Sequence, residues 1–332
     1  MSWKSAVKKI VLKSGPLRSL VCFVTPDFPR VFMYHRFSAA GEEIPGRVSA
    51  DNFAWQLEQM QKFGRVMSLA SCIDHYQQTG KWPARTVVVT VDDGYRDFYL
   101  YAYPELKKRG LPATFFTTVN FINRKIWLWP DRLDAALKGK SSCNFTINAH
   151  GNEEFFSYTN EDERKLVWKR LSDLCITLPN HLRFLVISQA EEELGADLPE
   201  IPTKEYEAST WDELREMSAA GIEVGSHTMN HPILSKISES ELDDEIARSK
   251  QILEEKLETA VRTFCYPNSC PDDINAFAVN KVEECKYSGA VFYFDLRSWD
   301  RFRIPRMNVS EWREDFYWKL CGGEFYGCPS LK

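Results

Sequence analysis

Two acidic side chains directly follow a β-branched run in the first third of the chain. Asp92 and Asp93 come after residues 86–91, which read Thr-Val-Val-Val-Thr-Val, and Gly94 follows them. Adjacent side chains of an extended strand face opposite ways, so the two carboxylates share a site only if the chain turns, as Gly94 permits. Two carboxylates held close together repel unless a cation lies between them. The segment predicts either a common Asp-Gly turn or an acidic cation site.

Two histidines lie four residues apart in a second segment with the potential to bind metal. His227 and His231 follow a predicted strand over residues 222–226. On one face of a helical turn this spacing suits a divalent ion, and the alternative is two surface histidines in a loop. Because the chain has only six histidines, a pair directly after a strand favours metal binding.

Three further polar groups lie near predicted strands. His35 ends the first strand, Asn268 follows a late strand and Arg306 lies in the last. In folds built on parallel strands, ligands bind at the carboxyl ends of the strands. Each of these residues is weak evidence alone, since a lone histidine is more often structural than catalytic.

The elements that must position these groups alternate between strands and helices. Capping boxes at Thr210 with Glu213 and at Ser238 with Glu241 mark two helix starts. Strands alternating with helices predict an α/β fold, a parallel sheet covered by helices. The predicted strands cover residues 30–35, 86–91, 113–119, 222–226, 262–267, 289–294 and 303–309.

The alternation is interrupted between residues 122 and 208. This segment contains Trp127, Trp129, an amphipathic helix around residues 161–174 and an acidic run over residues 190–202. It predicts a large insertion, or cap, between the aspartate and histidine motifs. The two tryptophans are either stacking platforms for a ligand or buried residues of the insertion's own core.

The composition excludes several classes of protein. The 332 residues are 44% hydrophobic and 27% charged, which excludes a disordered or low-complexity chain. The net charge of −5 disfavours non-specific nucleic-acid binding. No apolar run approaches the roughly 18 residues that span a bilayer. Nine dispersed cysteines without a CxxC motif predict free thiols in a reducing cytosol, and therefore a cytoplasmic protein.

The N-terminal segment differs in charge from the rest. Residues 1–30 contain six basic side chains and one acidic side chain. Lys13 and Arg18 interrupt the apolar stretch, which argues against a secretory signal. We interpret residues 1–28 as a basic amphipathic segment. It either packs on the barrel with its lysines solvated or lies on an anionic membrane surface.

Taken together, the motifs resemble those of the polysaccharide deacetylase (NodB-homology) superfamily of carbohydrate esterases. The resemblance covers residues 30–120 and 208–310 and implies a distorted (β/α) barrel of about seven parallel strands. Its motifs, in the family's order, are Met33-Tyr34-His35-Arg36, Thr90-Val91-Asp92-Asp93-Gly94, Ser226-His227 through His231-Pro232, Tyr266-Pro267 and Ile304-Pro305-Arg306.

The resemblance also implies a cofactor and site roles. Asp93, His227 and His231 are expected to hold a divalent metal, Zn²⁺ first with Co²⁺ or Ni²⁺ as alternatives. Asp92 is expected to be the general base, and Asn268 takes the position of the oxyanion donor. The candidates for substrate contact are Tyr266, Trp127 and Trp129.

Two departures from the family pattern concern the base and the acid. The arginine that orients the base in the family aligns with Cys265, so Arg306 is expected to supply that charge, with Arg303 and Arg262 as weaker candidates. No histidine follows His231, so the family's late catalytic histidine is missing. Some members carry it on the first strand instead, and His35 is the candidate there.

The sequence therefore predicts a cytoplasmic metal-dependent hydrolase that removes N-acetyl groups from sugars of a surface glycan or its lipid-linked precursor. One alternative is a deacylase of another small amide or ester, such as a formamido sugar. The other is a glycan-binding module with a decayed site. The expected organisation is an N-terminal segment over 1–28, the barrel over 29–121 and 209–332, and the insertion over 122–208.

Overall fold

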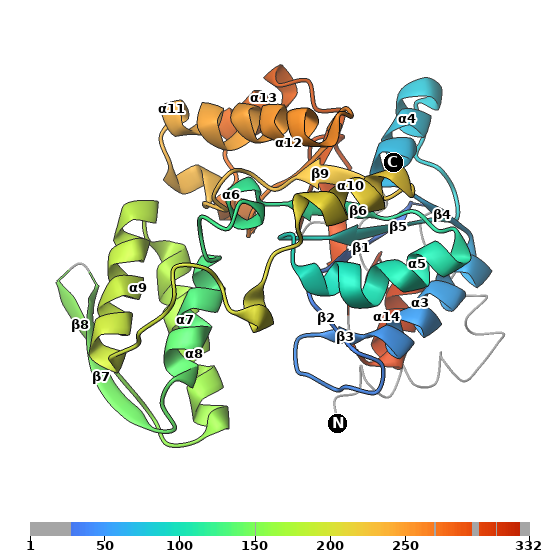
Figure 1. The fold of residues 1–332 in the computed structure, drawn as a ribbon. Coiled ribbons are helices and arrows are strands. Elements are labelled where there is room, and N and C mark those ends of the chain that lie inside the picture. The colour runs from blue at the N-terminus through green and yellow to red at the C-terminus, as the bar shows by residue number, and fades with distance from the viewer. Residues whose placement is uncertain (1–27, 150, 269, 294–298, 310, 326–332) are drawn as a thin grey trace.

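Seven parallel strands close into a barrel at the centre of the protein (Figure 1). A computed structural model describes residues 28–149, 151–268, 270–293, 299–309 and 311–325. Around the barrel the strands are β1 (Arg30–Tyr34), β12 (Ile304–Asn308), β11 (Gly289–Tyr293), β10 (Thr263–Cys265), β9 (Glu223–Ser226), β6 (Thr114–Thr117) and β5 (Thr86–Val91). Pairing of β5 with β1 closes the barrel. The predicted barrel of about seven parallel strands is confirmed.

Strand β5 is the strand on which the barrel closes and from which the acidic pair emerges. All six of its residues are buried, as expected for a β-branched parallel strand covered on both faces. A short strand, β4 (Arg65–Met67), pairs with the first half of β5, and β6 pairs with the second half. Strands β4 and β6 therefore share one edge of β5, which leaves β4 outside the closed ring.

Helices cover the outside of the barrel (Figure 1). The α-helices are α3 (Ala50–Phe63), α4 (Leu69–Thr79), α5 (Tyr103–Arg109), α6 (Val119–Ile122), α10 (Trp211–Ala219), α11 (Glu239–Leu242), α12 (Ser249–Leu257), α13 (Ala276–Glu284) and α14 (Arg313–Leu320). π-Helical turns cover Phe98–Ala102 and Asp243–Arg248, and 3₁₀ turns cover Lys204–Tyr206, Leu234–Lys236, Pro271–Asp273 and Gly323–Phe325. A small parallel pair joins β2 (Phe37–Ser38) to β3 (Val48–Ser49).

Local signals in the sequence explain where several helices begin and end. Both predicted capping boxes are present, at the starts of α10 and α11. Gly64 directly follows α3, and its backbone is extended rather than left-handed. A Cβ at Gly64 would lie 1.8 Å from the carbonyl oxygen of Arg85. Close approach of the chain therefore requires glycine there.

The segment between the two motifs has a hydrophobic core of its own. It contains α7 (Trp129–Lys138), the antiparallel hairpin β7 (Cys143–Ala149) and β8 (Asn152–Tyr158), α8 (Glu161–Thr177) and α9 (Asn180–Leu194). These elements lie to one side of the barrel, in green in Figure 1. Leu133, Phe145, Phe156 and Leu171 are among the buried residues that pack together between the helices and the hairpin.

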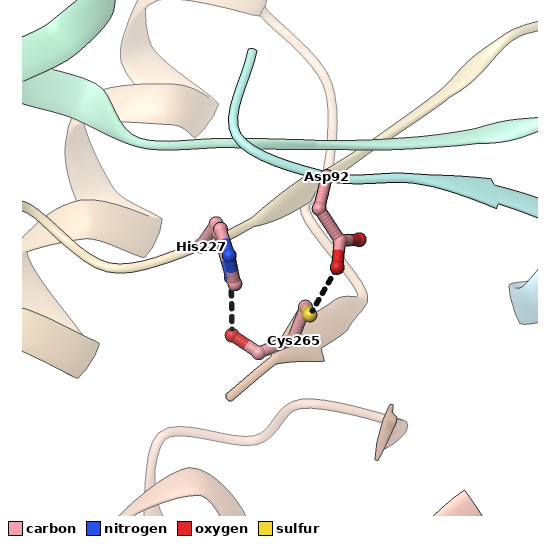
Figure 2. A group of neighbouring side chains, drawn as sticks. All are labelled: Asp92, His227 and Cys265. Atoms are coloured by element: carbon pink, nitrogen blue, oxygen red, sulfur yellow. Dashed lines mark hydrogen bonds between the residues drawn. The ribbon is translucent and has the colours of Figure 1, made fainter. Parts of the chain in front are cut away.

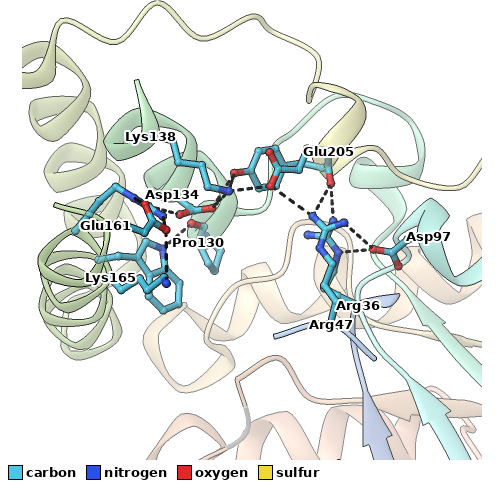
Figure 3. Close-up of polar contacts among 12 residues, drawn as sticks. Arg36, Arg47, Asp97, Pro130, Asp134, Lys138, Glu161, Lys165 and Glu205 are labelled. Carbon is cyan, nitrogen blue, oxygen red and sulfur yellow. Dashed lines mark hydrogen bonds and ion pairs between the residues drawn. The ribbon is translucent and has the colours of Figure 1, made fainter. Parts of the chain in front are cut away.

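A polar junction joins this segment to the barrel (Figure 3). The Glu205 carboxylate accepts a hydrogen bond from Lys138, at 2.8 Å, and lies 3.5 Å from Arg47. The Glu205 carbonyl accepts from Arg36, whose Nε also donates to Asp97 at 2.7 Å. Because Arg36 follows β1 and Asp97 follows β5, the junction lies near the carboxyl ends of these strands.

Nearly all of the predicted amphipathic segment 1–28 lies outside the described residues, so both its packing and its membrane contact stay predictions. Within the residues that the structure describes, no helix is both long and apolar enough to cross a membrane.

Candidate active site

Three buried side chains meet where β5 and β9 end. The Asp93 Oδ1 atom lies 3.4 Å from Nε2 of His227 and 3.4 Å from Nε2 of His231. The three residues are 8%, 2% and 7% exposed. The structure therefore brings together the residues that the resemblance assigns to metal binding, although two of them lie more than 130 residues from the first in the sequence.

A tight turn at Asp93 accounts for the direction of its side chain. The Gly94 N–H donates to the carbonyl of Asp92 at 3.0 Å, and Asp93 between them has a φ of 77°. This is a γ-turn of the strained kind. Asp92 is still paired with β1, through its N–H and the carbonyl of Tyr34. The turn thus ends the alternation of side-chain directions along the strand directly after Asp92. The sequence predicts the turn at Gly94, one residue later.

The two histidines lie on a loop, so the expectation of a helical turn is wrong. Thr228 and His231 have φ values of 71° and 57°, and a right-handed helix does not pass through such residues. The loop instead closes on itself, because the Thr228 hydroxyl accepts a hydrogen bond from the His231 N–H at 2.9 Å. The two imidazole rings end up 4.8 Å apart.

Hydrogen bonding fixes which nitrogen of His227 is available. Its Nδ1 atom lies 2.8 Å from the carbonyl oxygen of Cys265 (Figure 2). A carbonyl only accepts, so Nδ1 carries a proton, and in the neutral form of the ring the lone pair is on Nε2, on the side of Asp93. A histidine oriented in this way is typical of metal ligands. Among the described residues, Nδ1 of His231 has no hydrogen-bond partner.

The donor set fits a divalent ion. Ligands at about 2.0–2.2 Å in a tetrahedral arrangement lie about 3.3–3.6 Å from one another, which matches both distances from Asp93. Catalytic zinc sites have three protein ligands, and the carboxylate and two imidazoles here also make three. A second set of donors, Asp92, His227 and Cys265, lies within 4.8 Å. Arg306 already neutralises that carboxylate, so the second set is a poorer cation site.

Asp92 is held by an arginine from the far end of the chain. Arg306 donates from Nη1 to Oδ1 at 2.6 Å and from Nη2 to Oδ2 at 2.7 Å. Burial raises the pKa of Asp92, but the guanidinium more than offsets burial, and the pKa lies below its ordinary value. The Cys265 thiol lies beside this ion pair, 3.5 Å from Asp92 Oδ2 (Figure 2) and 3.1 Å from Arg306 Nη2. Arg262 pairs with Asp74 instead.

The candidate acid and the candidate oxyanion donor lie at strand ends. His35 follows β1, and its Nε2 atom lies 3.8 Å from Asp92 Oδ2 with 43% of the side chain exposed. Asn268 follows β10 with a φ of 56°. Its Nδ2 group is buried and has no hydrogen-bond partner among the described residues. A buried amide without a partner is costly to hold, so this donor is available to a bound molecule.

The three aromatic candidates for substrate contact are buried. Trp127 and Trp129 are 5% and 4% exposed, and Trp129 lies in the core of the insertion. Tyr266 is buried in the barrel core, and its hydroxyl donates to the carbonyl of Phe302. A sugar stacks only on an exposed aromatic face. We therefore do not retain these residues as substrate contacts.

Sequence reasoning missed an acidic residue that the insertion brings beside the site. The Tyr95 hydroxyl donates to Asp131 Oδ2 at 2.6 Å, and Tyr95 lies two residues after Asp93. Burial raises the pKa of Asp131 to about 7, and the charge of Asp93 adds to this shift while Arg36 opposes it. Asp131 lies in the first turn of α7, where an aspartate is unremarkable in sequence, so the pattern contained no signal for it.

Known proteins resemble the chain in both sequence and fold. The family model described as polysaccharide deacetylase matches residues 79–170 and 183–289. The structure of IcaB from Ammonifex degensii matches with a TM-score of 0.55 at 19% identity, covering 89% of this chain and 98% of that chain.

Two further solved structures are similar. The Streptococcus pyogenes deacetylase PplD in complex with acetate matches with a TM-score of 0.51 at 17% identity, over 86% of this chain and 93% of that chain. The polysaccharide deacetylase BC0361 from Bacillus cereus gives 0.51 at 16%, over 88% and 68%. No curated protein matches. At these identities the solved structures support the fold alone. The family model covers well over half of the residues, and the chain belongs to the polysaccharide deacetylase family.

Proposed function

We propose that this protein is a metal-dependent hydrolase that removes N-acetyl groups from the sugars of a glycan. The observation that carries the proposal is that two groups of side chains lie next to each other at one end of the barrel. One group is the donor cluster of Asp93, His227 and His231. The other is a carboxylate, Asp92, that Arg306 keeps ionised. A Lewis-acid site beside an ionised base is an arrangement that can hydrolyse an amide.

The proposed chemistry divides between the two groups. When bound to Asp93, His227 and His231, a divalent ion supplies a Lewis acid that makes water a better nucleophile near neutral pH. Asp92 would act as the general base that takes a proton from the attacking water. Both carboxylate oxygens of Asp92 accept hydrogen bonds from Arg306. These bonds hold the carboxylate in one orientation, so its remaining lone pairs have a fixed direction.

Two residues support the later steps of the proposed reaction. The amide nitrogen is a poor leaving group until it is protonated. His35 is the candidate acid, because its Nε2 lies 3.8 Å from Asp92 Oδ2 and its side chain reaches solvent. The buried Nδ2 of Asn268 is the candidate donor to the oxyanion.

The names of similar proteins support acetyl as the acyl group that is removed. One solved relative is a deacetylase in complex with acetate, and another, from Aggregatibacter actinomycetemcomitans, is described as a de-N-acetylase. The test is product analysis with N-acetylglucosamine oligomers and their N-formyl counterparts. We expect acetate release to exceed formate release. Predominant formate release would favour the formamido-sugar alternative, and release of neither acid, with oligomer still bound, would favour a glycan-binding module.

We further propose a cytoplasmic location, which the dispersed cysteines support. We also propose a lipid-linked substrate reached through residues 1–28, as the basic charge of that segment suggests. Co-sedimentation with anionic liposomes tests the membrane contact, with Lys8, Lys9 and Lys13 changed to Gln as the control. Binding of neither form at low salt would contradict it.

A further inference from the structure

The loop that carries both histidines is unusual in its backbone. Thr228 and His231, neither of them glycine, are left-handed within a span of four residues. Such conformations cost of order 1 kcal/mol or more each and persist only where the surroundings hold them. What holds this loop therefore bears directly on how His227 and His231 face Asp93.

One side of the loop is held by the chain that follows β6. Three consecutive carbonyls, those of His227, Thr228 and Met229, accept hydrogen bonds from the Thr118 hydroxyl, the Val119 N–H and the Asn120 N–H. These contacts fix the carbonyl side of the loop and leave its N–H groups to find partners elsewhere.

The other side is held by a single carboxylate, Glu245. Its Oε2 accepts from the N–H of Met229 at 3.0 Å and from the N–H of Asn230 at 2.9 Å. Its Oε1 accepts from the Asn230 side chain at 2.7 Å. Glu245 is 7% exposed, so water does not easily replace these bonds. The two N–H groups belong to the residues between the left-handed pair.

A local irregularity in the helix brings Glu245 to this position. Residues Asp243–Arg248 form a π-helical turn between α11 and α12. Such turns are rare and are frequent at functional sites. One helical turn later, the Ser249 hydroxyl lies 2.8 Å from that of Ser226, the last residue of β9. The same stretch of helix therefore contacts the loop both before His227 and before His231.

We propose that Glu245 is a positioning residue that holds the histidine loop in its ligand geometry and thereby sets the affinity of the site for a divalent metal. The inference rests on the proposed role of Asp93, His227 and His231 as ligands. Without the carboxylate, the N–H groups of Met229 and Asn230 lose their partner, and the loop relaxes in a way that moves His231 away from Asp93.

The test measures zinc affinity by chelator competition for the full-length protein, with Glu245→Gln, Glu245→Ala and Asp244→Asn as variants. Gln keeps one acceptor oxygen and Ala keeps none. Residues that orient metal ligands typically change affinity by about 10–100-fold. We expect weakening by about 10-fold for Gln and closer to 100-fold for Ala. Asp244 is an exposed acid of the same turn that pairs with Arg248, and its variant should match the wild type.

Two further readouts separate positioning from a general role in folding. The absorption spectrum of the Co²⁺-loaded protein reports ligand geometry, and we expect it to change in Glu245→Gln. Circular dichroism of the metal-free forms should show that Glu245→Gln remains folded. If the Gln variant binds zinc within twofold of the wild type, or if both Glu245 variants are unfolded without metal, the proposal is overturned. A wild-type protein that binds no zinc would overturn the ligand assignment itself, and the proposal with it.

Discussion

The Arg306 guanidinium and the Asp92 carboxylate form a bidentate ion pair inside the barrel, although they lie 214 residues apart in the sequence. Both residues are almost completely buried. A buried ion pair is a modest source of stability as a whole, but removal of one partner leaves the other charged and unpaired. The pair therefore links the fold to the ionisation of the proposed base.

Replacement of Arg306 should affect both stability and turnover. We expect Arg306→Ala to lower the free energy of unfolding by about 3–5 kcal/mol, because Asp92 is left as an uncompensated buried charge. Arg306→Lys keeps the positive charge but cannot make the bidentate contact. Relative to Arg306→Ala, it should therefore recover part of the stability and little of kcat. Urea unfolding and acetate release measure the two effects. An Arg306→Ala protein as stable as the wild type would contradict the structural role given to the pair.

Asp92 and Asp93 should differ although they are neighbours. Asp92→Asn should retain bound metal while kcat falls by roughly 10²–10⁴-fold, the usual contribution of a positioned base. Asp93→Asn should lose metal, because Asp93 lies 3.4 Å from both histidines. Elemental analysis of the purified variants separates the two roles. Equal metal content in both variants would show that the proposed division is wrong.

His35 should matter for turnover and not for folding. Its side chain is 43% exposed, so His35→Ala should leave the melting temperature and the metal content unchanged and lower kcat. If His35 is the acid, one limb of the pH–rate profile should disappear with it. His181, an exposed histidine of the insertion, provides the control variant. A normal kcat for His35→Ala would return the residue to a structural role.

Asp131 and Asp134, one helical turn apart, should give pH dependences of opposite sign. The pKa of Asp131 rises from 3.8 to about 7 on folding. Between these values the folded protein holds a proton that the unfolded chain has lost, so this contribution to stability falls as pH rises. For Asp134, burial raises the pKa, but Lys138, Tyr206 and Arg164 more than offset it, and the pKa lies below its ordinary value. Its contribution is therefore present near neutral pH and lost in acid.

Urea unfolding from about pH 2.5 to pH 8 tests this pair of signs on metal-free protein, because the contribution of Asp134 is lost only as the pH falls below the ordinary pKa of 3.8. Relative to the wild type, Asp131→Asn should gain stability as pH rises, and Asp134→Asn should lose it. Parallel curves for the two variants would contradict the assigned environments.

The sequence predicted the parts of the fold that depend on short-range pattern. The β-branched run of β5 and the two capping boxes are local signals, and the structure confirms them. The barrel itself came from the order of strands and from the family resemblance. In contrast, the left-handed residues of the histidine loop depend on contacts with Glu245 and with the chain after β6, which no local pattern specifies.

The same distinction applies to the site. Spacing and resemblance indicated Asp93, His227 and His231, because motif residues at strand ends converge in a barrel. Trp129 was ambiguous, since an aromatic residue looks alike in sequence whether it contacts a sugar or fills a core. Asp131 was missed, because its environment arises from the packing of the insertion beside Tyr95, a contact between elements.

The central claim is that hydrolysis depends on a metal held by Asp93, His227 and His231. The most direct measurement is acetate release from an N-acetylglucosamine oligomer by full-length protein, before chelation, after chelation and after addition of Zn²⁺ or Co²⁺. His227→Ala and His231→Ala serve as matched variants. We predict that chelation abolishes release, that metal restores it in the wild type, and that neither variant recovers at the same metal concentration. Undiminished release by metal-free protein would contradict the account.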